Sequence, residues 1–282
     1  MLTLTRQDGH EFAPPCFSQL NAPALVSYHQ ERDLPHPITA FNTSWWKLRA
    51  QFTSILDLLN GYSVGGGSDR DHPIMDAVEA LYFRAANFID VLERIVPEAL
   101  LPQEKGRFNL PRGLRSDLMM PANKLKHEAN VITLCGAKWW AVNVPAFMIF
   151  HMRGTSKIAN PIFHARRDAF SFNVELRRLL VKIYRFAAAV GEQVAELGYG
   201  TSQPTGMSAE NEALLRRLAE MPNYCWWDED RLMPTFAFDG EMLKLDEKGG
   251  LAKQVMRHEA TFTAIGTMDG YSRSIGFRGR TT

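Results

Sequence analysis

The chain has 282 residues, of which 45% are hydrophobic, so it can form one large domain or two modest ones. Its 32 basic and 31 acidic residues give a formal net charge of +1, which excludes a protein that is polycationic throughout. Any contact with nucleic acid must therefore come from a local patch. The three cysteines lie far apart, which argues against a disulfide framework and against a zinc knuckle.

Neither the first residues of the sequence nor its most apolar segment indicates a membrane protein. Residues 1–8 lack the charged start and the long apolar run of a signal peptide. The most apolar span, 142–152, is too short and too interrupted to cross a bilayer. We therefore expect a soluble cytoplasmic protein with no membrane partner.

Residues 1–38 are rich in proline and show no sustained hydrophobic period, which predicts an irregular arm. Apolar residues then recur at spacings of three and four, which predicts one helix over 41–59 and a second over 74–96. A glycine-rich stretch over 60–68 separates the two helices, and Pro97 follows the second.

A third helix is predicted over 114–134, with Pro121 kinking or restarting it. Apolar residues then cluster around a proline, which indicates a strand or hairpin over 139–152. The helical period returns over 160–197 and predicts a long amphipathic helix. Residues 39–200 are therefore expected to form a helical bundle.

Glycines and a proline between 198 and 208 indicate a linker before a small α+β region over 207–282. That region begins with a short charged helix over 209–221. Asp239-Gly240 separates two strand-like runs and is a strong hairpin signal, and Asp269-Gly270 follows another such run. We predict a mainly α chain, in which a helical bundle precedes a small region with β-hairpins.

A polar cluster lies within the third predicted helix, in the sequence Ala122-Asn123-Lys124-Leu125-Lys126-His127-Glu128. Asn123 and His127 are four residues apart, as are Lys124 and Glu128, so a helix places each pair on a common face. Asparagine, lysine and histidine side chains on one surface could bind a phosphodiester and cleave it without a metal. We therefore expect neither a metal nor a cofactor.

A helical bundle with Asn-Lys-x-Lys-His on an inner helix resembles the HEPN (higher eukaryotes and prokaryotes nucleotide-binding) class of bacterial proteins, over residues 40–197 at most. Members of that class are commonly metal-independent endoribonucleases, often toxins or antiviral defence components, and they usually act as homodimers. The resemblance implies that Asn123, Lys124 and His127 form a catalytic site. There a ribose 2′-OH would attack the adjacent phosphate while the histidine moves a proton.

The signature of the active class has an arginine directly before the polar residue, and this chain has Ala122 there. In the expected chemistry that arginine stabilises the charge on the pentacoordinate phosphorus, which contributes ~2 kcal/mol or more. Lys124, Lys126 or an arginine from elsewhere would have to replace it. The resemblance therefore leaves open whether the chain cleaves RNA or only binds it.

The residues expected to bind RNA are Lys126 and three arginines of the long predicted helix, Arg166, Arg167 and Arg177. A solvated polar face opposite the apolar stripe explains these arginines at least as well. For His127 the alternative is a partly buried side chain that is hydrogen-bonded to Asn123 and structures the kink after Pro121.

All six tryptophans occur as adjacent pairs, at 45–46, 139–140 and 226–227. Neighbours on a helix point about 100° apart, so one ring can enter the core while the other reaches a groove or a partner. Stacking on unpaired bases is one interpretation, and packing in a core or interface is the other. The second hypothesis is therefore a non-catalytic interaction or regulatory subunit that holds a protein partner.

Overall fold

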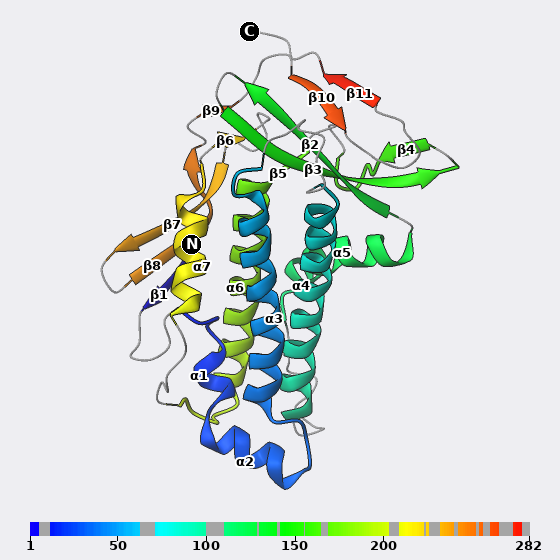
Figure 1. The fold of residues 1–282 in the computed structure, drawn as a ribbon. Coiled ribbons are helices and arrows are strands. Elements are labelled where there is room, and N and C mark those ends of the chain that lie inside the picture. The colour runs from blue at the N-terminus through cyan, green and yellow to red at the C-terminus, as the bar shows by residue number, and fades with distance from the viewer. Residues whose placement is uncertain are drawn as a thin grey trace.

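The computed structural model describes residues 1–5, 12–62, 71–99, 110–128, 130–139, 142–154, 156–164, 169–202, 209–222, 224–225, 232–239, 242–251, 254–255, 260–264 and 273–277. Within these residues the protein is mainly helical, with small sheets (Figure 1). The helices are α1 (Phe17–Leu20), α2 (Pro23–Glu31), α3 (Pro37–Leu59), α4 (Asp71–Ala99), α5 (Arg112–His127), α6 (Phe172–Glu196) and α7 (Glu210–Glu220). The strands are β1 (Leu2–Thr5), β2 (Asn130–Trp139), β3 (Val142–Arg153), β4 (Ser156–Ala159), β5 (Phe170–Ser171), β6 (Tyr224–Cys225), β7 (Leu232–Asp239), β8 (Met242–Leu251), β9 (Gln254–Val255), β10 (Ala260–Ala264) and β11 (Arg273–Phe277).

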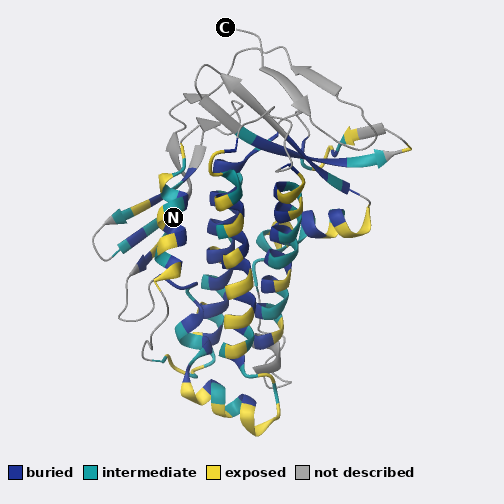
Figure 2. Cartoon of the chain, viewed as in Figure 1, coloured by how far each residue is buried: buried dark blue, intermediate teal, exposed yellow. Residues whose placement is uncertain are grey.

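Three long helices, α3, α4 and α6, form the body of the bundle (Figure 1). Their apolar stripes face one another, and buried positions follow these inner faces (Figure 2). The ring of Trp45 on α3 lies 5.5 Å from that of Phe88 on α4 and 5.7 Å from that of Tyr184 on α6, measured between ring centroids. The predicted helices over 41–59 and 74–96 are thus confirmed, and both are longer than the sequence indicated.

The N-terminal arm is more regular than expected. Instead of an irregular segment over 1–38, the structure has β1, α1 and α2 there, with the side chains of Leu20 and Leu25 buried. Two of the five prolines that suggested irregularity begin helices: Pro23 and Pro37 are the first residues of α2 and α3. Proline is suited to this position because its fixed φ is helical and its missing N–H would have no helical partner there.

The third helix is shorter than predicted. α5 ends at His127, and residues 130–139 form strand β2 instead of the last turns of a helix. The β-branched run from Val131 to Thr133 favours a strand, because a second branch at Cβ restricts χ1 in a helix. Pro121 does not interrupt α5; it lies inside the helix, and its ring is buried.

The fourth predicted helix, over 160–197, also begins later than expected, at Phe172. Phe163 and Phe170 have helical spacing relative to the rest of the stripe, but they precede the helix. Their rings pack on each other at 6.4 Å, and Phe170 lies 4.8 Å from the ring of His164. The predicted bundle over 39–200 therefore also contains a sheet.

That sheet is antiparallel and lies across one end of the bundle (Figure 1). β2 and β3 form a long hairpin, β4 pairs with β3 beyond it, and β5 pairs with β3 through Phe147 and Phe170. Phe147 also lies 5.0 Å from Phe172 and 6.3 Å from Tyr82, so its ring connects the sheet to α6 and α4. The strand or hairpin predicted over 139–152 is confirmed as part of β3, with β2 as its partner.

The C-terminal region contains the predicted hairpins. β7 pairs antiparallel with β8, with Asp239 opposite Met242, and β10 pairs antiparallel with β11. β1 adds to β8 in the order β1-β8-β7, which places the N-terminal strand in a sheet with the C-terminal region. Leu243 and Leu245 of β8 are buried in the same hydrophobic core as the bundle.

In the part of the chain that the structure describes, no helix combines the length and apolarity needed to span a bilayer.

Arg177 connects α6 to the end of α7. It is only 2% exposed, and its guanidinium donates to the carbonyl oxygens of Leu218 (2.6 Å), Ala219 (3.1 Å) and Met221. These carbonyls belong to the last turn of α7, where helical acceptors lack backbone partners. Burial lowers the pKa of Arg177 to about 10, so the side chain stays charged at neutral pH.

We predict that Arg177→Ala lowers the free energy of unfolding by about 2–3 kcal/mol, because it leaves several carbonyls of α7 without a donor. Lys182→Ala on the same helix removes a surface ion pair with Asp117 and should cost at most about 1 kcal/mol. Urea denaturation followed by circular dichroism measures both variants. Equal destabilisation by the two substitutions would contradict the anchoring role of Arg177.

Candidate functional site

Asn123 and His127 lie on the last two turns of α5, and both side chains are exposed. Neither makes a hydrogen bond or ion pair with the described residues, so the alternative in which His127 bonds to Asn123 is not what the structure has. Lys126 beside them is also exposed and unpaired within the same residues. The sequence-predicted site is therefore an accessible end of a helix.

Lys124 is occupied within the chain. Its ammonium pairs with the Glu128 carboxylate four residues later, as the sequence predicted, and Glu128 is half exposed. An ion pair of this kind on a helix contributes only about 0.3 kcal/mol, so it does not prevent Lys124 from changing partner.

Ala122, which stands at the arginine position of the resembled signature, points into the protein. It is 4% exposed and belongs to the hydrophobic core beside Leu118 and Leu125. Neighbouring positions on a helix point about 100° apart, so the side chain of residue 122 starts on the core-facing side of α5 and that of Asn123 on the exposed side.

The end of α5 is held by an amide network that the sequence did not predict. Asn130 is buried and donates to the carbonyl oxygens of Lys124 (2.9 Å) and Glu128 (3.4 Å), while its own oxygen accepts from Asn160 Nδ2 at 2.8 Å. Asn160 in turn bonds through its backbone N–H to Ile149 on β3 at 2.9 Å. The orientation of Asn123 and His127 therefore depends on the β2–β4 sheet.

Of the three arginines expected to bind RNA, the structure describes one, Arg177. Arg166 and Arg167 lie outside the described residues, and Arg177 is buried against α7. Two other basic residues of α6 form ion pairs with acids, Arg178 with Glu175 and Lys182 with Asp117.

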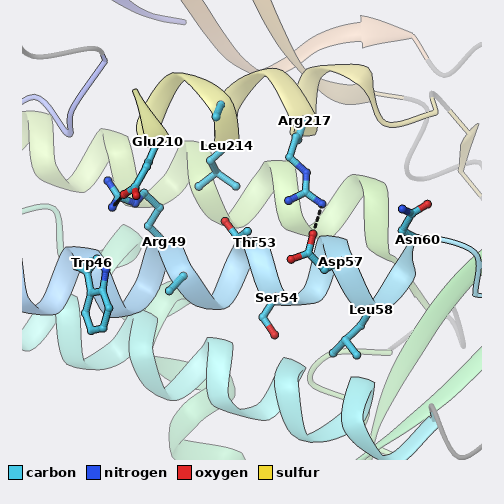
Figure 3. A pocket seen from close by; sticks show the side chains of 12 residues that line it. Trp46, Arg49, Thr53, Ser54, Asp57, Leu58, Asn60, Glu210, Leu214 and Arg217 are labelled. Atoms are coloured by element: carbon cyan, nitrogen blue, oxygen red, sulfur yellow. Dashed lines mark hydrogen bonds and ion pairs between the residues drawn. The ribbon is translucent and has the colours of Figure 1, made fainter. Parts of the chain in front are cut away.

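A hollow with a volume of about 740 Å³ lies elsewhere, between α3 and α7 (Figure 3). Residues at helical spacing line it from each side, so we name it the α3–α7 groove. Its lining from α3 is Trp46, Arg49, Ala50, Thr53, Ser54, Asp57, Leu58 and Asn60, and from α7 it is Glu210, Ala213, Leu214 and Arg217.

Two ion pairs join the walls of the α3–α7 groove. Arg49 bonds to Glu210 near one end, and Arg217 donates to Asp57 at 2.7 Å near the other (Figure 3). Arg49 also donates to Asn211 Oδ1 at 3.1 Å, which accepts from Trp45 Nε1 at 2.9 Å as well. Burial lowers the pKa of Arg49, because desolvation disfavours the cation.

Trp46 lies at the edge of this groove and is 58% exposed, whereas its neighbour Trp45 is 1% exposed. The expectation that one ring of a tryptophan pair enters the core while the other reaches a groove is confirmed for this pair. The side chains of the pairs at 139–140 and 226–227 lie outside what the structure describes.

The described residues contain no group of three or more histidine, cysteine, aspartate or glutamate side chains that could hold a metal ion. Comparison of the chain with protein-family models, with curated proteins and with solved structures gives no match.

We predict that Asn130→Ala lowers the free energy of unfolding by about 2 kcal/mol, because two carbonyls at the end of α5 and the amide of Asn160 lose a buried partner. Asn123→Ala, on the same helix but exposed and unpaired, should change it by no more than about 0.5 kcal/mol. Thermal or urea unfolding of the two variants gives the comparison. A larger effect at Asn123 than at Asn130 would refute this account of the network.

Proposed function

We propose that the protein is a non-catalytic binding protein whose recognition surface is the α3–α7 groove. The observation that carries the proposal is the exposure of Trp46 beside a hollow of about 740 Å³. Burial of a large apolar ring is favourable, so an exposed tryptophan gains free energy when a partner covers it. Exposed tryptophans are typical anchors of protein interfaces.

The chemistry of the groove supports binding rather than catalysis. Its charged side chains are engaged in ion pairs across the walls, and its other polar residues are Thr53, Ser54 and Asn60. The described residues place no histidine or cysteine in its lining that could act as a base or a nucleophile. What the groove offers is shape, an aromatic ring and fixed charge.

Loss of Trp46 should abolish partner binding without unfolding the protein, because the ring is mostly exposed. We expect the immobilised wild type to retain one or more proteins from a nuclease-treated lysate of the cells that make it. The amount of these proteins that Trp46→Ala retains should be at least tenfold lower. Ile162→Ala is the matched control, since Ile162 is 53% exposed but lies away from the groove. Quantitative mass spectrometry of the retained proteins provides the readout. A retained set that is the same for all three forms would refute the proposal.

A second candidate function is RNA binding or cleavage at the exposed end of α5, as the resemblance to HEPN proteins implies. The observation in its favour is that Asn123, Lys126 and His127 are exposed and unpaired within the described residues. Two features weigh against cleavage: Ala122 faces the core, and the carboxyl end of a helix carries partial negative charge, which disfavours a phosphate. In this candidate, Lys126 and a homodimeric partner would supply the missing positive charge.

RNA cleavage at this site would survive EDTA, leave cyclic phosphate ends and vanish in His127→Ala, because the imidazole would move the proton without a metal. We expect the isolated protein to show no such activity on mixed RNA in gel assays. Cleavage that depends on both His127 and Asn123 would establish the second candidate. Cleavage that EDTA abolishes and that is unchanged in His127→Ala would exclude both the metal-independent mechanism and a purely non-catalytic role.

A further inference from the structure

The α3–α7 groove is hollow because small side chains occupy the exposed positions in its middle. The charged side chains lie at its two ends, where Arg49 bonds to Glu210 and Arg217 bonds to Asp57. Between these ion pairs the exposed positions carry small side chains, Ala50, Ser54 and Ala213. Asp57 follows Arg49 by eight positions on α3, which corresponds to about 12 Å along the helix.

The two ion pairs also give the groove a polarity. In each pair the carboxylate is the more exposed partner: the Glu210 side chain is 62% exposed against 9% for Arg49, and that of Asp57 is 65% exposed against 38% for Arg217. The formal charges balance, but the acids lie toward solvent and the arginines toward the protein. An approaching partner therefore meets negative charge at both ends of the hollow and an aromatic ring at Trp46.

We infer that the occupant of the groove is an α-helix of a partner protein, in which an apolar residue is flanked one turn before and one turn after by lysine or arginine. This inference rests on the proposed function. The apolar side chain enters the hollow over Ala50 and Ala213, and the two basic residues meet Glu210 and Asp57. Residues seven or eight apart on a helix lie on one face about 10–12 Å apart, which matches the spacing along α3 of Arg49 and Asp57, the α3 members of the two ion pairs.

A helix fits this surface better than an extended peptide does. Both walls are helices, so their backbone groups are already paired, and the described lining of the groove includes no strand edge with which an extended chain could bond. A helix brings its own backbone hydrogen bonds and offers a ridge of side chains to a groove between two helices. The small residues on the floor let that ridge approach closely.

The test uses the intact protein and a blocked, alanine-rich helical peptide of about 18 residues, with a leucine flanked at i−4 and i+4 by lysine. We expect saturable one-to-one binding in isothermal titration calorimetry, weakened at least tenfold when both lysines are replaced by glutamate. The double variant Asp57→Asn, Glu210→Gln should lose at least tenfold in affinity for the lysine peptide. Glu220→Gln, which changes an exposed acid of α7 outside the groove, should bind as the wild type does.

A second variant tests whether peptide binding needs the hollow itself. Ala213→Leu fills the centre of the groove from an exposed position, so the fold should tolerate it while peptide binding falls at least tenfold. Absence of binding to the lysine peptide, or binding that is indifferent to the acids and to Ala213, would overturn the inference. So would a dimer in analytical ultracentrifugation that Trp46→Ala dissociates, because the occupant would then be a second copy. Trp46-dependent capture together with failure of the peptide rejects the helical occupant alone, whereas failure of both rejects the proposed function.

Discussion

The indole of Trp45 is the contact on which the arrangement of the helices depends. Its ring packs against Phe88 of α4 and Tyr184 of α6, and its Nε1–H donates to Asn211 of α7 at 2.9 Å. One side chain of α3 thus fixes the positions of three other helices, and it does so with both apolar area and a directed hydrogen bond. Because Asn211 also accepts from Arg49, the same junction sets the distance between α3 and α7 and so determines that a groove forms there.

The helical part of the fold could be predicted from periodicity wherever the apolar stripe is packed by other helices, as in α3 and α4. Prediction failed at the junctions with the sheet. Around Val131 the apolar spacing suits either a helix or a strand, and the partner that decides the outcome, β3, follows later in the chain. The prediction for the N-terminal arm failed for a related reason. β1 pairs with β8, and nothing within residues 1–38 specifies a partner so distant in sequence.

The candidate sites differ in how much of their geometry could be predicted from the sequence. The i,i+4 spacing correctly placed Lys124 beside Glu128, because that relation is local to one helix. The inward direction of Ala122 and the burial of Arg177 depend on which elements pack nearby, and no spacing within the motif reports that. The α3–α7 groove depends on two segments separated by most of the chain. Its one sequence signal was the tryptophan pair, of which the structure buries one ring and exposes the other.

The position of β1 has a consequence for how the chain reaches its folded state. Leu2 on β1 pairs with Leu245 on β8, although the two residues lie far apart in the sequence. Every helix described in the structure lies between these two strands in the sequence, so the bundle can assemble before the sheet that β1 completes. Pairing of such distant segments is slow, and an unpaired strand is a hazard for aggregation while it waits. The β1-β8-β7 sheet is therefore expected to form after the helices, because it joins segments that are far apart in the sequence.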